Sequence, residues 1–175
     1  TKDGGRFVSL AWSGHRSSDV NLEDPNFDNG DYDPWAAYGR SKTANILFAV
    51  EFDRRHKDRG VRATALHPGG IHTELARHLD DGALEALLEQ INATARETGG
   101  EEFEFKSIPQ GAATSVWAAA VADPAEVGGP YLEDCHVAEL VEGDGLRGGV
   151  RAYAIDADNA KALWAKSEEL VGERF

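Results

Sequence analysis

Two short apolar runs flank a long apolar segment in the first part of the chain. Residues 6–11 (RFVSLA) and 61–68 (VRATALHP) are bounded by glycine or proline and predict strands. Between them, Asp33 suits the N-cap of a helix, and Pro34 suits its first position, where the missing N–H costs nothing. We expect this helix to run to about Lys57. Because its stretch ANILFAV is apolar all round, we expect it to be buried on most sides.

A strand, a long helix and a second strand form a βαβ unit, whose strands are parallel, so the fold class is α/β. The segment 13–32 is rich in Gly, Asp, Asn and Ser and predicts a loop. Further elements are expected downstream: a glycine loop passing into a short helix within 68–79, a helix at 82–97, a helix after Pro109, a third strand within 127–132, a surface hairpin loop at 142–149 and a terminal helix from Asp158.

Composition narrows the possible partners and setting. The chain has 175 residues, which suits one domain, and a formal net charge of -13, which repels nucleic acid and anionic lipid. The lone Cys135 forms no internal disulfide, no apolar run reaches about 18 residues, and the first residues lack a signal peptide. We therefore expect a cytoplasmic protein with no membrane span and no nucleic-acid partner. Methionine is absent, which indicates a removed initiator or a chain that starts within a longer product.

Tyr38 and Lys42 are the main chemical candidates. Four residues apart on a helix, they lie on one face, so an ammonium near the phenol is expected to lower the phenol pKa and to suit it for proton transfer at a carbonyl or alcohol. Such a pair also occurs by chance on many helices. Its position at the start of a crossover helix favours function, because ligands bind α/β sheets at the carboxyl ends of the strands. The loop HPGGIHT follows the next strand and lies at that same edge.

The stretches YGRSK and HPGGIHT resemble the Tyr-x-x-x-Lys signature and the Pro-Gly loop of the short-chain dehydrogenases/reductases. The wider text DPWAAYGRSKTANILFAVEF, with PQGAATSVWAA and GGPYLEDC, is similar to the subgroup of retinol dehydrogenases, the WW-domain oxidoreductase and protochlorophyllide-reductase-like enzymes. The resemblance implies NAD or NADP as cofactor, hydride transfer to or from a small hydrophobic alcohol/carbonyl substrate, Tyr38 as acid/base, and Lys42 as its partner on the nicotinamide ribose. It also implies cofactor contacts in the loop, from Pro68, Gly69, Ile71 and Thr73.

Two departures accompany the resemblance. The family carries a serine near the end of the strand before the long loop, where this chain has Ala11 and Trp12. Ser13 lies one residue later and replaces that hydroxyl only if the strand end is irregular, since a shift of one residue reverses the face. The Gly-rich dinucleotide fingerprint, expected well before Tyr38, is absent from the first 37 residues.

The chain thus resembles the C-terminal half of such an enzyme: one partial domain over residues 1–175, with about three strands of a Rossmann-type doubly wound parallel sheet and flanking helices. The strand at 6–11 would then have an unpaired edge, and we expect an isolated chain that is marginally stable, swapped or homo-oligomeric. A sharp melt of a monomer at high temperature would contradict this expectation.

The remaining candidate residues give weaker evidence for a function. His67 and His72 lack metal-binding partners nearby, so no metal is expected. Cys135 is interpreted as a packed thiol beside a surface His136, and Trp117 and Trp164 as core residues, with Trp117 also able to border a substrate cleft. Two functions stay open: an NAD(P)-dependent oxidoreductase, favoured by the intact Tyr38 and Lys42, and a non-catalytic remnant serving as a packing or interaction module, favoured by Ala11-Trp12.

Overall fold

A computed structural model describes residues 4–74, 81–99, 102–143 and 148–175. Four strands form one sheet in the order β1-β2-β3-β4: β1 (Gly5–Leu10), β2 (Val61–His67), β3 (Tyr131–Glu133) and β4 (His136–Val137). The first three strands are parallel, and β4 runs antiparallel to β3. The predicted α/β class and the parallel βαβ unit are confirmed, and the sheet corresponds to part of a Rossmann-like fold.

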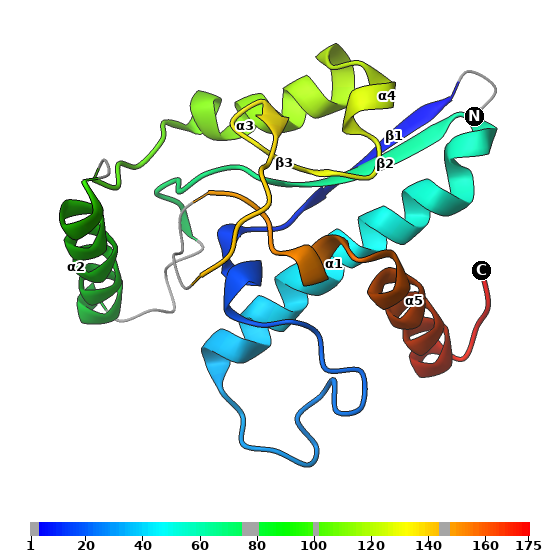
Figure 1. The fold of residues 1–175 in the computed structure, drawn as a ribbon, viewed down its shortest axis with the longest axis horizontal. Helices are drawn as coiled ribbons and strands as arrows, with labels where there is room; N and C mark the ends of the chain where they lie inside the picture. Colours follow the sequence, from blue (N-terminus) through cyan, green and yellow to red (C-terminus); the bar gives the residue numbers. More distant parts are fainter. Residues whose placement is uncertain (1–3, 75–80, 100–101, 144–147) are drawn as a thin grey trace.

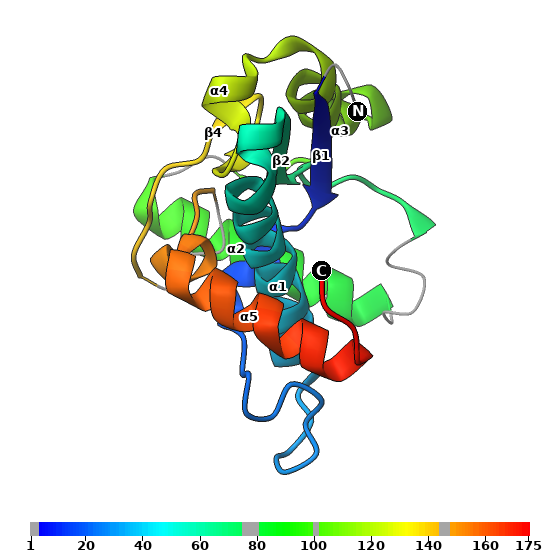
Figure 2. The same cartoon turned by 90° about the vertical axis from the view of Figure 1, so that its right-hand side faces the viewer.

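Helices cover both faces of this sheet (Figures 1 and 2). One face carries α1 (Pro34–His56) and α5 (Ala157–Val171), and the other carries α3 (Ile108–Val116), the π-helical turn η4 (Trp117–Val121) and α4 (Pro124–Val127). Helix α2 (Asp81–Thr98) lies apart from both layers in Figure 1. The sheet is therefore the middle of three layers.

Successive residues of β2 and β3 pack into two separate hydrophobic cores, because adjacent side chains on a strand face opposite ways. Ala65 and Tyr131 pack with Ile46 of α1, whereas Leu66 and Leu132 pack on the α3 and α4 side. Both strands are consequently buried on both faces, as parallel strands are in α/β proteins. Trp117 and Trp164 also contribute to packing, as predicted: Trp117 borders the second core, and Trp164 is buried on α5 and stacks on Phe48.

Local residues at each end of α1 account for where this helix begins and ends. The Asp33 carboxylate accepts a hydrogen bond from the Ala36 amide at 2.6 Å, and the segment after the helix ends at Gly60, whose φ of 74° suits a residue without Cβ. The predicted burial of α1 on most sides is wrong in part. Phe48 stays 38% exposed while Glu51 and Asp53 are buried, because these two carboxylates are paired with arginines.

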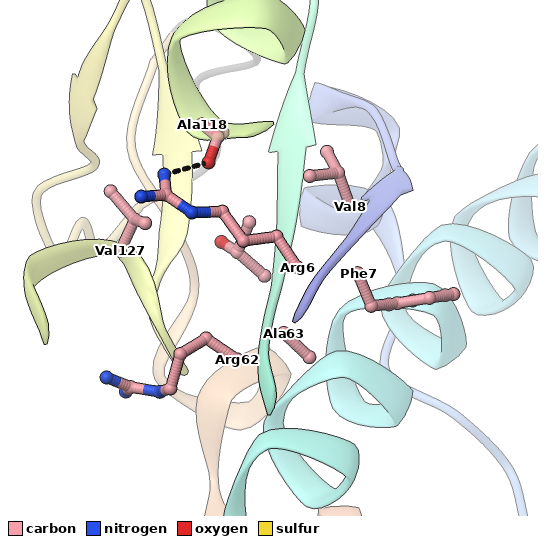
Figure 3. A pocket seen from close by; sticks show the side chains of 8 residues that line it. Arg6, Phe7, Val8, Arg62, Ala63, Ala118 and Val127 are labelled. Carbon is pink, nitrogen blue, oxygen red and sulfur yellow. Dashed lines mark hydrogen bonds between the residues drawn. The ribbon is translucent and has the colours of Figure 1, made fainter. Parts of the chain in front are cut away.

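Strand β1 is an edge strand in the described part of the chain, since it pairs with β2 alone. Its Arg6 reaches over the α3-side face and donates to the Ala118 carbonyl at 2.7 Å (Figure 3). It also donates to the Ala122 carbonyl at 2.6 Å. These carbonyls lie in and just after the last turn of the continuous helix formed by α3 and η4, where a cation is favourable. The edge predicted from the sequence is confirmed, and Arg6 ties it to the helical layer.

Several expectations need correction. The segment 13–32 is not all loop, because a 3₁₀ helix, η1 (Ser13–Ser17), follows β1. Cys135 is exposed, not packed, and with Asp134 it forms the positive-φ turn between β3 and β4. The ends of the loop at 142–149 pair through Leu140 and Val150 in the parallel sense, so it is not a hairpin connection. The third strand, at Tyr131–Glu133, occupies only the end of the predicted range 127–132, and β4 was not predicted. The short helix expected within 68–79 falls mainly on residues 75–80, which lie outside the described residues.

Candidate functional site

Tyr38 and Lys42 lie one turn apart on the N-terminal half of α1. The Lys42 Nζ atom is 5.1 Å from the centroid of the Tyr38 ring, so the ammonium stands over the ring face. Both side chains are half-buried. Within the described ranges, neither the Tyr38 hydroxyl nor Lys42 Nζ forms a hydrogen bond with another protein group. Their polar atoms are therefore available to a bound molecule.

Burial sets the charge state of this pair. It raises the pKa of the Tyr38 hydroxyl and lowers the pKa of the Lys42 ammonium, since each charged form loses hydration. The expectation that Lys42 lowers the pKa of Tyr38 is not met in this conformation, because the ammonium faces the ring and burial dominates. The phenol is consequently a proton donor at neutral pH.

Trp12 lies where the family's serine pair was expected, and its indole contacts Tyr38. The two ring centroids are 5.5 Å apart at 70°, an edge-to-face contact, and the indole also lies 6.4 Å from the His67 ring. A Cβ at Gly14 would collide with the indole, so a residue with no side chain leaves room for it. Trp12 thereby connects the Tyr38 face of α1 with the end of β2.

Ser13, the candidate substitute for that serine, is the first residue of η1 and forms no hydrogen bond with Tyr38 among the described residues. The backbone at Trp12 is extended, with φ of -171° and ψ of 163°, and the chain enters η1 only at Ser13. The extended backbone therefore ends before Ser13, so the alternation of faces along a strand does not place its side chain, and its role as a substitute hydroxyl stays a prediction. The aromatic ring, rather than a hydroxyl, borders the phenol.

His15 anchors this turn from within. Its Nδ1 atom donates to the Trp12 carbonyl at 2.8 Å, its Nε2 atom accepts from the Arg151 amide at 3.4 Å, and its ring packs against Tyr131. The His15 carbonyl accepts from the hydroxyls of Thr43 and Tyr153, at 3.2 and 2.6 Å. Burial, with Arg16 and Arg151 nearby, lowers the pKa of His15 to about 4, so the imidazole is neutral.

The glycine loop begins where β2 ends, at the same edge of the sheet as Trp12. Gly69 has a φ of 92°, and the Lys106 side chain crosses it. Ile71 packs on Gly111 of α3, which has no Cβ to obstruct it, and pairs with Lys106 as an isolated bridge. Thr73 is exposed. The structure therefore holds Pro68 to Ile71 against the segment before α3.

Three residues near this loop, His67, Lys106 and Asp134, have contacts that the sequence did not predict. His67 has a buried Nδ1 atom with no hydrogen-bond partner, and burial together with the charge of Lys106 lowers its pKa to about 4. Lys106 forms an ion pair with Asp134 of the β3-β4 turn. From the sequence, His67 was considered only as a metal ligand together with His72, and no spacing in the sequence relates Lys106 to Asp134.

Buried neutral histidines make stability depend on pH. His15 and His67 have pKa values of about 4 in the folded protein, against 6.5 in an unfolded chain, so the unfolded state binds protons first as pH falls. The stabilisation is complete above pH 6.5 and is lost on acidification toward pH 4. We expect the free energy of unfolding to fall by about 2 kcal/mol per histidine between roughly pH 7 and 5, measured by urea denaturation.

The variant His15→Gln tests this account, since it removes one of the two groups. Its free energy of unfolding should depend less steeply on pH, whereas His136→Gln, which changes an exposed imidazole in β4, should keep the wild-type slope. An unchanged slope in His15→Gln would show that His15 is not the group responsible.

An α/β fold with a tyrosine-lysine pair on its crossover helix, beside a glycine loop at the carboxyl ends of the strands, is the arrangement expected of the class of oxidoreductases that the sequence resembles. Comparison with known proteins agrees with this class. The chain is 39% identical over 170 residues to the short-chain dehydrogenase/reductase prx1 of Penicillium roqueforti, covering 95% of this chain and 46% of that protein. It is 42% identical over 163 residues to a probable oxidoreductase of Streptomyces lividans, covering 91% and 52%.

More distant relatives fit the same class. Retinol dehydrogenase 14 of Mus musculus is 33% identical over 167 residues, covering 95% of this chain and 44% of that protein. A crystal structure of an uncharacterized protein from Mycobacterium Paratuberculosis superposes with a TM-score of 0.57 at 30% identity, covering 98% of this chain and 52% of that one. No family model matches the chain.

The chain belongs to the short-chain dehydrogenase/reductase family. It spans about half the length of the curated relatives that it matches. No described helix is long and apolar enough to cross a membrane.

Proposed function

We propose that the protein is an NAD(P)-dependent oxidoreductase that transfers hydride between the nicotinamide cofactor and a hydrophobic alcohol or carbonyl compound. The observation that carries the proposal is the Tyr38 and Lys42 pair, whose polar atoms are free of protein hydrogen bonds in the described part of the chain. The relatives named as oxidoreductases support the reaction class, and retinol dehydrogenase 14, named for a hydrophobic alcohol, supports the substrate class.

The residues present fit a nicotinamide cofactor. Lys42 carries an ammonium with no protein acceptor among the described residues, which suits the ribose hydroxyls. The loop from Pro68 to Thr73 offers backbone groups next to Gly69 for the nicotinamide end, with Ile71 fixed on α3 beside them. The cofactor supplies the hydride chemistry, and the protein supplies binding, orientation and proton transfer.

Proton transfer falls to Tyr38. In carbonyl reduction its protonated hydroxyl donates to the substrate oxygen, and in alcohol oxidation the same oxygen accepts the proton. The raised pKa of Tyr38 keeps its hydroxyl protonated near neutral pH, which is the form that donates a proton in carbonyl reduction. Trp12 borders the phenol with an indole, which favours an apolar substrate over a charged one.

Cofactor binding and turnover test the proposal together. The purified protein is titrated with NADH and with NADPH, following nicotinamide fluorescence, and is then assayed for oxidation of each by hydrophobic aldehydes and ketones. Binding with carbonyl-dependent oxidation is the expected result. Binding without turnover on any such carbonyl would favour the non-catalytic remnant, and failure to bind either cofactor would contradict the proposal.

A further inference from the structure

A cavity lies away from the Tyr38 and Lys42 pair, between α1, α5 and the segment that joins η1 to α1. It has a volume of about 360 Å³. The joining segment extends below the N-terminal half of α1 in Figure 1. Ala37, Ser41 and Ala44 line the cavity from α1, and Leu163 lines it from α5. At 100° per residue this stripe lies roughly 120° round the helix from Tyr38 and Lys42, so the two sites face different ways.

Arg40 brings a cation into this cavity with few of its donors used. The Nη1 atom donates to the Asp24 carbonyl at 3.3 Å, whereas the Nε atom is buried with no hydrogen-bond partner. None of the ion pairs between described side chains involves Arg40. A guanidinium has five N–H donors, and a buried one without an acceptor is unfavourable. The Arg40 Nε donor therefore lacks an acceptor in this cavity.

The residues around the Arg40 guanidinium position it but form no ion pair with it in the described part of the chain. The Arg40 Cζ atom lies 4.1 Å from the centroid of the Phe27 ring, which in turn packs edge-to-face on Tyr32. Phe27 has a φ of 60°, an unusual conformation for a residue with a side chain. The nearby Asp24 carboxylate accepts from the amides of Asp28 and Asn29, at 2.7 and 3.1 Å, and forms no ion pair with Arg40.

The remaining lining is largely apolar and includes Val20, Leu22 and Pro25. A cavity of this size is in the range that binds small molecules, and such cavities combine apolar walls with a few polar groups that fix orientation. A carboxylate matches the planar fork of a guanidinium, and an apolar body matches the walls. The net charge of -13 opposes anions at long range, but salt at about 0.15 M screens charges beyond roughly 8 Å.

We propose that this cavity binds a small carboxylate with an apolar body, its carboxylate on Arg40 and its body against Phe27 and Leu163. This site is independent of the oxidoreductase chemistry proposed for Tyr38. It rests on the cavity, the unpartnered Nε atom and the aromatic platform under the guanidinium.

The test uses 4-phenylbutyrate as probe and its neutral amide, 4-phenylbutyramide, as matched analogue. Titration calorimetry should give a dissociation constant of about 1 mM or tighter for the carboxylate and binding at least about tenfold weaker for the amide. In NMR spectra the carboxylate should shift the Arg40 Nε–H resonance. Arg40→Gln should weaken carboxylate binding at least about tenfold, whereas Arg59→Gln, which changes an exposed arginine, should leave it unchanged.

Several results would overturn the proposal. They are no binding of the carboxylate, equal binding of the carboxylate and the amide, unchanged binding in Arg40→Gln, or shifts confined to residues around Tyr38. If Arg40→Gln fails to fold, the comparison of the two probes on the wild-type protein still decides. Because none of these measurements uses a nicotinamide cofactor, their failure is distinct from failure of the proposed function.

Discussion

Replacing Tyr38 by phenylalanine is expected to lower carbonyl-dependent turnover by roughly a hundredfold to ten-thousandfold. The change removes only the hydroxyl that would donate the proton. That hydroxyl forms no hydrogen bond within the described residues, and the ring that packs on Trp12 at 5.5 Å is retained. The variant should therefore keep its melting temperature and its affinity for NADH or NADPH, measured in parallel with the steady-state rate.

Tyr32→Phe is the matched control for this experiment. Tyr32 is an exposed tyrosine before α1, so removing its hydroxyl should change neither the rate nor the melting temperature. If Tyr38→Phe keeps more than about a tenth of the turnover, the tyrosine is not the proton donor. A loss of rate accompanied by a large drop in melting temperature would instead indicate a structural role.

The frame of the fold was predictable because its signals are local. Asp33 and Pro34 mark the start of α1, and an apolar run ending at Pro68 marks β2. These signals depend on backbone hydrogen bonding within a few residues, and they also locate Tyr38, Lys42 and the glycine loop at one edge of the sheet. The roles of Tyr38, Lys42, Ser13 and the loop remain predictions until activity is measured.

The parts that escaped prediction depend on contacts between distant segments. The turn η1 is held by the hydroxyls of Thr43 and Tyr153, which donate to the His15 carbonyl from 28 and 138 residues away. The sign of the pKa shift at Tyr38 was also mispredicted. Helical spacing brings Lys42 near the phenol but does not say that the ammonium faces the ring or that burial outweighs its charge.

Trp12 changes the chemistry that is expected beside Tyr38. From the sequence it removes a hydroxyl, and Ser13 is the neighbouring candidate to supply one. In the structure the indole occupies the place beside Tyr38, with Gly14 leaving room for it. The chemistry next to the phenol is therefore that of an aromatic surface, which concerns the choice of substrate as much as the rate.

The apolar pattern of α1 conceals a buried carboxylate, Asp53, that is paired with Arg62 of β2. The Asp53 carboxylate accepts from Arg62 Nε at 2.8 Å, Arg62 Nη2 at 3.1 Å and the Ala63 amide at 2.8 Å. Arg62 also donates to the carbonyls of Pro124 and Gly128 at 2.7 and 2.8 Å. Asp53 thus links α1 to β2 and, through Arg62, to both ends of α4.

We expect Asp53→Ala to lower the free energy of unfolding by about 3 to 5 kcal/mol, because it leaves a partly buried guanidinium and a buried amide without their acceptor. Small domains have a total of about 5 to 15 kcal/mol, so this variant loses a large share of its stability. Asp53→Asn keeps one oxygen acceptor and should lose less, which provides a folded variant for urea denaturation. Asp58→Ala, at an exposed aspartate beyond α1, should stay within about 0.5 kcal/mol of wild type. If Asp53→Ala also stayed within about 1 kcal/mol, the packing of α1 on the sheet, rather than this ion pair, would hold the two layers together.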